Sequence, residues 1–518
     1  MSARAISLGE LLRGRGDAGA AGDIVVRGLS LDSRRVERGD AFVALAGTQA
    51  HGITFAPAAS ARGAAVILAD PAGIAAPASA AALQPGFGIR DSGFGSSNSN
   101  SNNEVAPVVW VEGLREQLGG IASRFFGEPS QALRVIGVTG TNGKTSIVQL
   151  LAQALHRAGH PTATIGTLGA GLYGAVREGE RTTPDAIAVH GLLAAFRRQG
   201  ASHVAMEVSS HALEQGRVNA VAFHLAVFTN LTRDHLDYHG TMAAYGAAKQ
   251  RLFDWPGLGA AIINVDDAFG RVLASKLPAG VRCLRYGIER DEADVVARAI
   301  GGSAGGLAFR IATPWGEAEV SSRLLGRFNV SNLLAVAACL GELGLPFERV
   351  VESLGALEPV AGRLSRLGGS GAQPLVVIDY AHTPDALEQA LSSLRAHCSG
   401  RLTCVFGCGG ERDRGKRPEM AAIAEALADR VIVTDDNPRG EDGDAIVEQI
   451  LAGLRRPELA RVERDRAAAI ALAIGEAQPG DVVLVAGKGH EPYQDVAGVK
   501  RPFDDLDVAR RALGTRAC

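Results

Sequence analysis

The sequence predicts an α/β protein with three domains, and three observations support this prediction. The chain has 518 residues, a length that usually divides into about three hydrophobic cores. An apolar, β-branched run at 135–138 leads through a glycine-rich turn into a helical pattern, the order from which parallel sheets are built. After residue 362, four apolar strands each end in a polar cluster. We place the domains at 1–111, 112–361 and 362–518.

Charge and hydropathy exclude several classes of protein. The 53 basic residues nearly balance the 56 acidic ones without a long run of like charge, so we expect no nucleic acid and no anionic membrane as a partner. Residues 1–16 lack the apolar core of a signal peptide, and no later apolar run reaches the roughly 18 residues of a membrane span. We therefore expect a cytoplasmic protein.

The cysteines predict neither a disulfide framework nor a metal cluster. None of the 6 cysteines forms a CxxC pair, and Cys404 and Cys408 have no partner pair at metal-ligand spacing. Reduced and mostly buried thiols are the expectation.

The first segment reads as a small α/β unit. Alternation at 41–45 predicts a strand, and 56–63 predicts a helix that leads into a second strand at 64–68. Asp32 and Ser33 stand where propensity alone favours the cap of a turn.

A polar tract interrupts the first domain. Residues 86–104 are rich in Ser and Asn and poor in aromatic residues, a composition that cannot bury a core, so we predict a disordered insertion. A strand at 108–111 and a helix at 114–126, which joins the first domain to the second, follow it.

The loop Gly140 to Gly143 has the features of a phosphate cradle. Backbone N–H groups of such a loop and of the helix after it point at one anion, Lys144 adds a positive charge, and the Thr145 hydroxyl can reach a phosphate-bound Mg²⁺. The strict Walker spacing requires glycine where Val138 stands, so this is a variant loop.

Further along the central domain, two strands deliver candidate ligands. Glu207 lies near the carboxyl end of an apolar strand at 204–208, where an unpaired carboxylate is costly and where ligands of parallel sheets collect. His235 and His239 follow a strand at 225–229 with the spacing of a zinc protease, but Leu236 replaces the required Glu, which excludes that class.

Three other residues of this domain are ambiguous by themselves. Lys249, in a predicted helix at 245–253, would usually be solvated, and Asn329 and Asn332 could each cap the helix that begins near 327.

The last domain carries its polar residues at strand ends. We expect each of its strands to be followed by a helix, and chemistry gathered at carboxyl ends is the layout of an open parallel sheet with its ligand above the switch point. The predicted strands are 375–378, 402–406, 431–434 and 482–485.

Together these segments resemble the Mur ligase superfamily, the ATP-dependent amide-bond ligases that include the cell-wall peptide synthetases and folylpolyglutamate synthase. The resemblance covers nearly the whole chain apart from the insertion. It implies a small UDP-binding α/β domain, a central P-loop ATPase-like parallel sheet and a C-terminal Rossmann-like domain. The motifs that carry it are Gly-Thr-Asn-Gly-Lys-Thr at 140–145, Thr-Thr-Pro at 182–184, Phe-Gly-Cys-Gly-Gly-Glu-Arg-Asp at 406–413, Asp-Asp-Asn-Pro-Arg at 435–439 and Gly-Lys-Gly-His-Glu at 487–491.

The resemblance also implies an activity. The segment 436–439 is similar to that of members that add meso-diaminopimelate to the D-Glu of UDP-N-acetylmuramoyl-L-Ala-D-Glu. Such members act through an acyl phosphate and release ADP and phosphate. They serve peptidoglycan synthesis, and through it cell-wall biogenesis, cell shape, cell division and the cell cycle. We expect small-molecule partners and a monomer.

Roles for single residues follow from the same resemblance. The catalytic set is Lys144, Glu207, His235 and Lys249, with Lys249 as N6-carboxylysine, and the Mg²⁺ set is Thr145, Glu207, His235 and Lys249. The expected ATP contacts are Gly140, Thr141, Asn142, Gly143, Lys144, Thr145, Ser146, Asn329, Asn332, Arg363 and Asp379. The expected contacts to the UDP substrate are Ser33, Thr48, Gln49, Ala50, Thr182, Thr183, Ser209, Gln215 and Arg217. The expected diaminopimelate contacts are Arg412, Asp436, Asn437, Pro438, Arg439, Gly487 and Glu491.

The charges of the last set suit diaminopimelate, which differs from lysine by a second carboxylate. A guanidinium can grip a carboxylate with two parallel bonds, so Arg439 with Arg412 fits the extra group. Glu491 and the amide of Asn437 could hold the distal ammonium. Lysine would leave the arginines unpaired, and polar sites reject such analogues by roughly 10⁴-fold.

Other functions compete with this hypothesis. A lysine-adding homologue and folylpolyglutamate synthase are rivals among ligases, and the first domain and Arg439 count against them. A P-loop kinase or a nucleotide-gated binding module is a rival of another class. The polar strand ends of two further domains disfavour a simple kinase.

Overall fold

A computed structural model of the chain describes residues 5–47, 50–72, 106–179, 181–303, 305–369 and 371–516. The predicted insertion at 86–104 lies outside the described residues, as do Thr48 and Gln49. The chain forms two compact units: the first comprises 1–148, 159–261 and 275–282, and the second comprises 149–158, 262–274 and 283–518. The division falls within α4 (Lys144–Arg157), α9 (Ala268–Ser275), β12 (Ala260–Asn264) and β13 (Arg282–Gly287).

The first unit begins with a small parallel sheet in the order β3-β4-β5-β6. Side chains of β4 alternate between two apolar clusters: Ala41 and Val43 enter one, and Phe42 and Ala44 enter the other. Both faces are therefore covered, as a parallel sheet requires. The elements are β1 (Ile6–Ser7), α1 (Leu8–Leu12), β2 (Val25–Val26), β3 (Gly28–Ser30), η2 (Ser33–Arg35), β4 (Asp40–Ala44), η3 (Gly52–Phe55), α2 (Ala56–Ala61), β5 (Val66–Ala69) and β6 (Val108–Trp110).

Helix α3 (Leu114–Phe125) connects this sheet to the next part of the unit, as the sequence predicts. Leu114, Leu118 and Ile121 lie in the same apolar cluster as the N-terminal helix, and Ala186 of α5 joins that cluster.

The central strands of the first unit follow the order β11-β7-β10-β8-β9, and all but β9 run parallel. Val135, Ile136 and Val138 of β7 are fully buried, which explains the unbroken apolar run in the sequence. The elements are β7 (Arg134–Thr139), β8 (Thr162–Gly166), β9 (Gly169–Leu172), α5 (Ala186–Arg198), β10 (His203–Glu207), α6 (Ser210–Glu214), β11 (Phe223–Phe228), α7 (Leu236–His239) and α8 (Met242–Gln250).

The second unit contains a sheet portion in the order β16-β15-β14-β13. The β14–β15 and β15–β16 pairs are antiparallel, whereas β13 and β14 run parallel. Helix α10 is buried from Asn329 to Gly341 apart from Ser331, in keeping with its nearly continuous apolar sequence. The elements are β14 (Val295–Ser303), β15 (Gly306–Thr313), β16 (Gly316–Ser322), α10 (Arg327–Glu342) and α11 (Phe347–Ala356).

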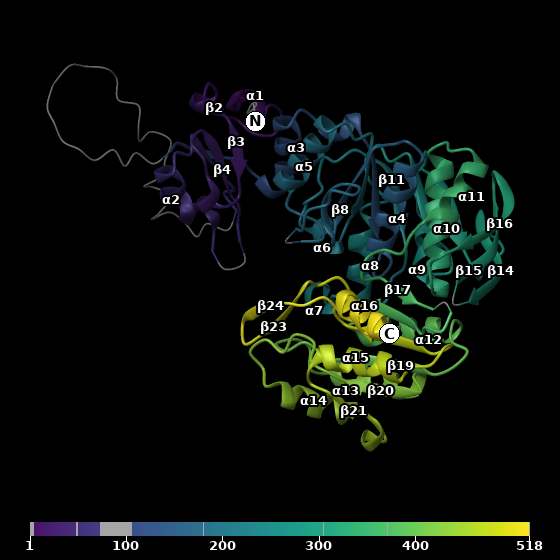
Figure 1. Cartoon of the computed structure of the whole chain (residues 1–518). Helices are drawn as coiled ribbons and strands as arrows, with labels where there is room; N and C mark the ends of the chain where they lie inside the picture. Colours follow the sequence, from purple (N-terminus) through teal and green to yellow (C-terminus); the bar gives the residue numbers. More distant parts are fainter. Residues whose placement is uncertain are drawn as a thin grey trace, which may run out of the picture. The chain divides into compact units, whose positions relative to one another are not determined.

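The chain ends in a six-stranded sheet of order β17-β18-β22-β19-β20-β21, parallel except for β17. Leu375 and Val377 of β18 face a cluster that includes α12, α13 and α14, whereas Val376 and Ile378 face α15 and α16. Figure 1 labels these five helices. The elements are β17 (Ser365–Gly368), β18 (Leu375–Asp379), α12 (Pro384–Arg395), β19 (Leu402–Phe406), α13 (Lys416–Leu427), β20 (Arg430–Val433), α14 (Gly443–Leu451), β21 (Arg461–Val462), α15 (Arg466–Glu476), β22 (Val482–Ala486), β23 (Tyr493–Val496), β24 (Val499–Pro502) and α16 (Asp505–Arg516).

The predicted strands of this sheet are confirmed as β18, β19, β20 and β22, but one expectation about their connections is wrong. A β-hairpin, not a helix, follows β22, and α16 begins only after it. Ala497 and Gly498 join Val496 to Val499 and both have positive φ, the backbone of a type I′ hairpin turn.

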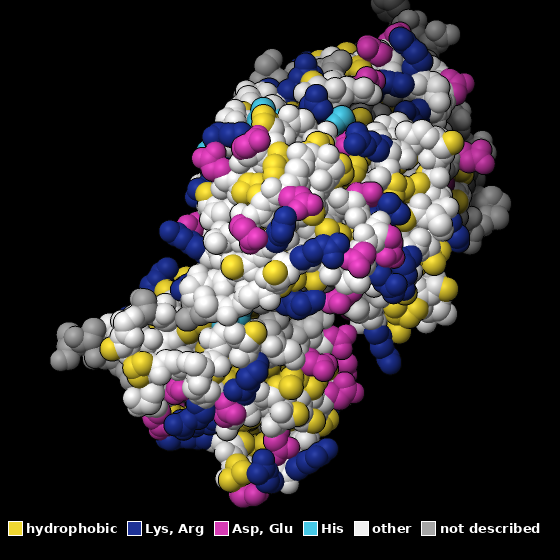
Figure 2. Space-filling view, turned by 90° about the vertical axis from the view of Figure 1, so that its right-hand side faces the viewer, with side chains coloured by type: hydrophobic (Ala, Val, Ile, Leu, Met, Phe, Trp, Pro, Cys, Tyr) yellow, Lys and Arg dark blue, Asp and Glu magenta, His cyan; other side chains and the backbone are white. Residues whose placement is uncertain are grey.

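The surface and the cysteines agree with the composition. On the face drawn in Figure 2, basic and acidic side chains are interspersed. Among the described residues, Cys339, Cys404 and Cys408 are buried free thiols, while Cys283 and Cys398 are partly buried free thiols. No helix of the described ranges is long and apolar enough to cross a membrane.

Candidate active site

The loop between β7 and α4 is held by the segment that follows β11. The amide N–H of Thr141 donates to the carbonyl oxygen of Asn230 at 2.8 Å, and that of Asn142 donates to Asn230 Oδ1 at 2.9 Å. Gly140 has a φ of 148°, and a Cβ at this position would lie 1.8 Å from Thr229 Oγ1. The tight approach requires glycine, which explains the first residue of the variant motif.

Two lysines meet at this loop. Lys144 Nζ donates to the carbonyl oxygens of Gly140 and Thr141 at 2.9 and 2.7 Å, and Lys249 Nζ donates to the same Gly140 oxygen at 2.8 Å. Lys249 is 1% exposed, and burial together with the Lys144 charge holds the pKa of Lys249 well below its usual value. A lysine that would be solvated on an isolated helix thus becomes a buried amine beside the candidate phosphate loop.

Glu207 ends β10 in a buried position. Its Oε1 accepts from the backbone N–H of Thr167 at 2.8 Å, and its Oε2 accepts from the Thr167 hydroxyl at 3.2 Å. A Cβ on Gly166 would come within 2.4 Å of Oε1. The last residue of β8 must therefore lack a side chain so that the Glu207 carboxylate can fit beside it. These contacts stabilise a buried carboxylate without a cationic side chain.

His235 stands at the start of α7 with a φ of 52°. The His235 side chain is 46% exposed, and its partial burial, followed by the charges of Lys144 and Lys249, lowers its pKa, although Asp234 opposes the shift. The imidazole is therefore favoured in its neutral form, which is the form that binds metals. Its ring centre lies 6.0 Å from that of Tyr245, which itself lies under the Lys249 ammonium.

Two of the four expected metal ligands, Thr145 and Glu207, have side-chain chemistry that suits Mg²⁺. A carboxylate and a threonine hydroxyl are hard oxygen donors of the type that Mg²⁺ prefers. In the described ranges no group of three His, Cys, Asp or Glu side chains could hold a metal ion. An all-protein cage is thus not found there, and the fit rests on Thr145, Glu207 and the loop.

A second polar cluster joins the ends of three segments of the first unit. The Thr183 hydroxyl donates to the Glu207 carbonyl oxygen at 2.8 Å and receives the Ser209 N–H at 3.2 Å. Arg217 donates to the Thr183 carbonyl oxygen at 2.9 Å and to Gln215 Oε1. The structure therefore brings together four expected substrate residues, Thr183, Ser209, Gln215 and Arg217. The hydroxyl of the preceding residue, Thr182, lies 3.1 Å from the hydroxyl of Thr167.

The expected UDP contacts of the first sheet lie elsewhere. Ser33 is buried in η2, where Asp32 caps the turn; hydrogen bonding to Arg34 lowers the pKa of Asp32 to about 2. Ala50 is exposed, and its carbonyl oxygen accepts from Gly47 N–H. Within the described residues, no hydrogen bond connects Ser33 or Ala50 with the Thr183 cluster.

His239 has the spacing of a zinc ligand, a role that Leu236 excludes. In the structure each nitrogen of its ring has a partner. Its Nδ1 lies 3.1 Å from Glu214 Oε2, its Nε2 lies 2.9 Å from Ser210 Oγ, and its side chain is 1% exposed. These contacts fasten the short helix α7 to α6 and so fix the segment that carries His235.

In the second unit, Asn329 and Asn332 are buried and linked. Asn329 Nδ2 donates to the Leu325 carbonyl oxygen at 2.8 Å, and Asn332 Nδ2 donates to Asn329 Oδ1 at 2.8 Å. The N-cap residue of α10 is Gly326, without a side-chain cap. Neither asparagine is therefore the cap of this helix.

Asp379 ends β18 and is fixed by backbone donors. Leu364 N–H and Ala381 N–H donate to its two oxygens at 2.7 and 2.9 Å. Burial raises the pKa of Asp379, and the Arg363 charge and these donors oppose that shift. The Arg363 guanidinium also lies 4.9 Å from the centre of the Tyr380 ring.

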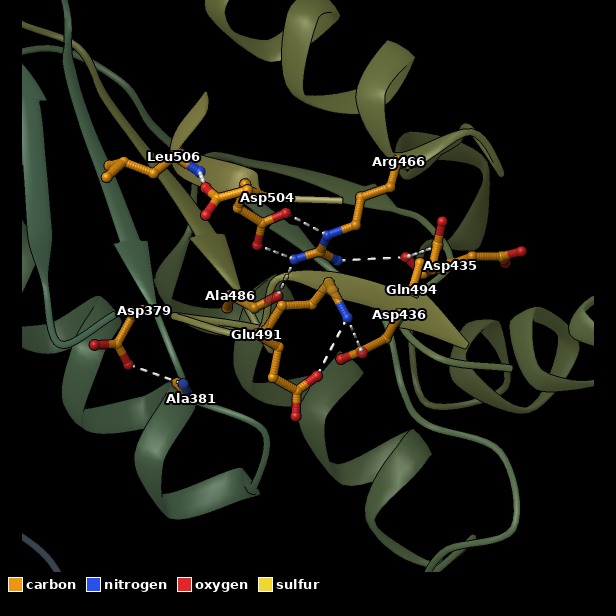
Figure 3. Close-up of polar contacts among 12 residues, drawn as sticks. Asp379, Ala381, Asp435, Asp436, Arg466, Ala486, Glu491, Gln494, Asp504 and Leu506 are labelled. Carbon is orange, nitrogen blue, oxygen red and sulfur yellow. Dashed lines mark hydrogen bonds and ion pairs between the residues drawn. The ribbon is translucent and has the colours of Figure 1, made fainter. Parts of the chain in front are cut away.

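The ends of β20 and β22 bring acidic side chains together with two cations, Lys488 and Arg466; Figure 3 labels Asp436, Glu491 and Arg466. Asn437 Nδ2 donates to Glu491 Oε2 at 2.9 Å, and Lys488 Nζ donates to Asn437 Oδ1 at 2.9 Å and to Glu491 Oε2 at 3.2 Å. Gly487 has a φ of 118°, and a Cβ there would lie 2.5 Å from Asp436 Oδ2. Lys488 lies within the Gly-Lys-Gly-His-Glu motif, but the motif alone assigns it no role.

Arg439 and Arg412 flank one glycine. A Cβ on Gly409 would lie 2.9 Å from Arg439 NH1 and 3.8 Å from Arg412 Cγ. Arg439 NH1 donates to the Gly410 carbonyl oxygen at 2.8 Å, and the Arg439 backbone pairs with Asp495 and Ala497 of the hairpin. Pro438 precedes it and is buried. The side chains of both arginines thus lie beside Gly409.

Comparison with known families covers most of the chain. Residues 25–126 match the model described as Mur ligase family, catalytic domain; residues 138–340 match the Mur ligase middle domain; and residues 362–489 match the Mur ligase, glutamate ligase domain. The chain belongs to the Mur ligase family. This Mur ligase therefore has the mixed α/β, three-domain architecture of its family, as the sequence predicts.

Relatives of this Mur ligase match it from end to end. A protein of Xanthomonas campestris pv. campestris (strain 8004), named UDP-N-acetylmuramoyl-L-alanyl-D-glutamate--2,6-diaminopimelate ligase, is 55% identical over 98% of this chain and 98% of its own. A protein of the same name from Pseudomonas aeruginosa is 49% identical over 95% of this chain and 96% of its own. A solved structure of a ligase of that name covers 99% of this chain and 100% of its own, with 36% identity and a TM-score of 0.72.

The fit of Gly140 against Thr229 predicts an effect on stability. Gly140→Ala should lower the free energy of unfolding by roughly 1–3 kcal/mol, because its methyl group would overlap a hydroxyl and the backbone behind it. Urea unfolding followed by circular dichroism measures the change. Gly159→Ala is the matched control, since Gly159 also has positive φ but a Cβ there meets nothing within 4 Å. Equal losses in the two variants would contradict the steric argument.

Proposed function

We propose that this Mur ligase joins meso-diaminopimelate to the D-Glu of UDP-N-acetylmuramoyl-L-Ala-D-Glu, with ATP converted to ADP and phosphate. The observation that carries the proposal is the full-length identity of 55% to a relative named for that reaction. The neighbouring arginines at Gly409 and the acidic cluster at Glu491 support it, because a diamino dicarboxylic acid needs both kinds of partner.

The phosphates of ATP are assigned to the loop 140–146. Helix α4 begins at Lys144, directly after the glycine turn, so its first N–H groups can donate to an anion, and Lys144 supplies a charge that can move from carbonyl oxygens to phosphate oxygens. Mg²⁺ held by Thr145 and Glu207 would neutralise charge on the transferred phosphoryl group. In the second unit, Asn329, Asn332, Arg363 and Asp379 remain the proposed ATP contacts.

The chemical step begins with attack of a γ-carboxylate oxygen of D-Glu on the terminal phosphorus of ATP. The bond to the bridging oxygen breaks, ADP leaves, and an acyl phosphate forms. The unprotonated amine of diaminopimelate then attacks the acyl carbon, phosphate leaves with the bonding electron pair, and the nitrogen loses a proton. Lys144 stabilises the phosphoryl charge during the first transfer.

Lys249 is the proposed site of carbamylation. Its lowered pKa favours the free amine, which can attack CO₂ to give a carbamate with release of one proton. The product is an anionic oxygen ligand in place of a cation, which suits Mg²⁺ together with His235. The modification would also remove the repulsion between Lys249 and Lys144.

The muramyl dipeptide is assigned to the Thr183 cluster. Ser209, Gln215 and Arg217 converge there on the chain segment beside Glu207. The Thr182 hydroxyl extends the same polar surface. Ser33 and Ala50, with Thr48 and Gln49, are proposed to contact the UDP portion.

The amino acid is assigned to the ends of β19, β20 and β22. Arg439 and Arg412 would bind the carboxylate that lysine lacks, and Glu491 with Asn437 would receive an ammonium group. Asp436, Pro438 and Gly487 complete the proposed pocket, and the Asp436 carboxylate adds negative charge beside Lys488. Boundaries at 1–111, 112–361 and 362–518, a monomeric state and a cytoplasmic location complete the proposal.

The decisive experiment measures phosphate release from ATP and Mg²⁺ with UDP-N-acetylmuramoyl-L-Ala-D-Glu and either meso-diaminopimelate or L-lysine. We expect turnover with meso-diaminopimelate alone, and a preference of roughly 10⁴-fold in kcat/KM. Turnover with lysine alone would retain the ligase and reject the role of Arg439. Hydrolysis of ATP that needs no amino acid would favour a kinase or a nucleotide-gated module.

Replacing Lys249 tests the carbamate. Lys249→Ala should lower kcat by roughly 10²–10³-fold, because a preorganised electrostatic group is lost, and added formate should restore part of the rate by supplying a carboxylate. Initial rates of phosphate release provide the measurement. Lys276→Ala, at an exposed lysine, should retain the wild-type rate. A folded Lys249→Ala enzyme with wild-type kcat would exclude the modification.

Replacing Arg439 tests the choice of amino acid. Arg439→Lys keeps the charge but loses the planar pair of donors, so the KM for meso-diaminopimelate should rise roughly 10- to 100-fold. The KM for ATP should stay constant. Arg414→Lys, an exposed change in the neighbouring loop, is the control. An unchanged KM in Arg439→Lys would assign the second carboxylate to another residue.

A further inference from the structure

Lys488 is a fully buried cation directly after β22. Its side chain is 0% exposed, and its Nζ donates to Asn437 Oδ1 and to Glu491 Oε2 at 2.9 and 3.2 Å. The ammonium also lies 3.9 Å from Asp436 Oδ1. Burial of a lysine is costly unless hydrogen bonds and opposite charges compensate it, and here both are present.

The contacts of Lys488 determine how the Asn437 amide is oriented. Asn437 Oδ1 receives the ammonium and the Asp495 N–H, each at 2.9 Å, while Nδ2 donates to Glu491 Oε2 at 2.9 Å. Two donors therefore face the oxygen edge and one acceptor faces the nitrogen edge. A flipped amide would lose all three bonds.

Lys488 also differs from the other cation of this cluster. Arg466 is held by both carboxylate oxygens of Asp505 at 2.7 Å, so its charge is already paired. The charged and titratable groups that influence Asp436 or Glu491 include Arg466, Lys488, Lys416, Asp505, Tyr380, His382 and Cys408. Among these, Lys488 is the cation that contacts Glu491 directly.

We propose that Lys488 is the positioning residue of the amino-acid site: it fixes the Asn437 amide and the Glu491 carboxylate in the arrangement that receives the ammonium group of the incoming amino acid. The inference rests on the proposed function. The hydrogen bonds to Glu491 within the described residues use Oε2, so Oε1 is the oxygen offered to the ligand. Lys488 itself touches no reacting atom.

The test compares Lys488→Met with Lys500→Met. Lys500 lies 4.2 Å from the Tyr493 ring centre and Lys488 lies 5.5 Å from it, but Lys500 is exposed on β24. Lys488→Met should raise the KM for meso-diaminopimelate at least tenfold and leave the KM values for ATP and the UDP substrate within twofold. Lys500→Met should change none of them. A folded Lys488→Met enzyme with an unchanged KM overturns the proposal.

Two further readouts separate positioning from stability. Burial raises the pKa of Asp436, while Arg466 and Lys488 lower it. Without Lys488 this pKa rises, so the acid limb of kcat/KM for meso-diaminopimelate should move to higher pH. In addition, Glu491→Gln should have little further effect on KM in the Lys488→Met background. The proposal is rejected if the acid limb of kcat/KM does not move and the effects of Lys488→Met and Glu491→Gln on KM are fully additive. Lys488 would then contribute only to stability.

Hydrogen exchange keeps the inference testable without turnover. The Asp495 N–H is bonded to the oriented Asn437 amide, so the segment 493–497 should exchange at least tenfold faster in Lys488→Met and remain unchanged in Lys500→Met. If Lys488→Met does not fold, Lys488→Gln retains a donor without the charge and is measured instead. An inactive wild-type enzyme would reject the proposed function, whereas unchanged exchange in the Lys488 variant would reject the positioning role.

Discussion

Backbone hydrogen bonds between loops at the carboxyl edge of parallel strands are the constraint on which both candidate sites depend. Neighbouring strands end at the same edge, so the loops that leave them must satisfy one another's polar groups. The loop after β7 does so through the Thr141 N–H, which donates to the Asn230 carbonyl oxygen at 2.8 Å, and the loop after β22 does so through the Gly487 N–H, which donates to the Asp379 carbonyl oxygen at 3.1 Å. Glycine recurs at these points because a Cβ at Gly140 or Gly487 would overlap the neighbouring loop. The reactive side chains are thus fixed by the same contacts that complete the sheet.

Much of this arrangement could be predicted from the sequence because it depends on local patterns. The runs that became β7, β10 and β18 are apolar on both faces, since helices cover both sides of their sheets. Polar residues after such runs must gather at one edge, which is why Glu207 and Asp379 were identified without coordinates. The motif at 435–439 was recognised through resemblance, and its residues do lie beside Glu491. The roles of these residues in binding remain predictions.

The remaining features depend on contacts that no local pattern specifies. The spacing of His239 suggested only a metal ligand, whereas its partners Ser210 and Glu214 lie more than twenty residues earlier. Asn329 and Asn332 had the composition of a helix cap but bond to each other within a buried helix. The hairpin after β22 was missed because Ala497 adopts a positive φ that its side chain does not favour. Tertiary packing decided each of these cases, and in each it overrode a reasonable local expectation.

The two buried lysines show how surroundings assign different chemistry to one residue type. Lys249 is buried beside the positive charge of Lys144, so its ammonium form is disfavoured despite its hydrogen bond to the Gly140 carbonyl oxygen, and its amine becomes available to an electrophile. Lys488 faces the carboxylates of Glu491 and Asp436, which favour the cation that holds them. A motif records the lysine in both cases but not the sign of the charge opposite it. The loops that meet at the sheet edge determine that sign. It distinguishes Lys249, a candidate for modification, from Lys488, a charge that positions its neighbours.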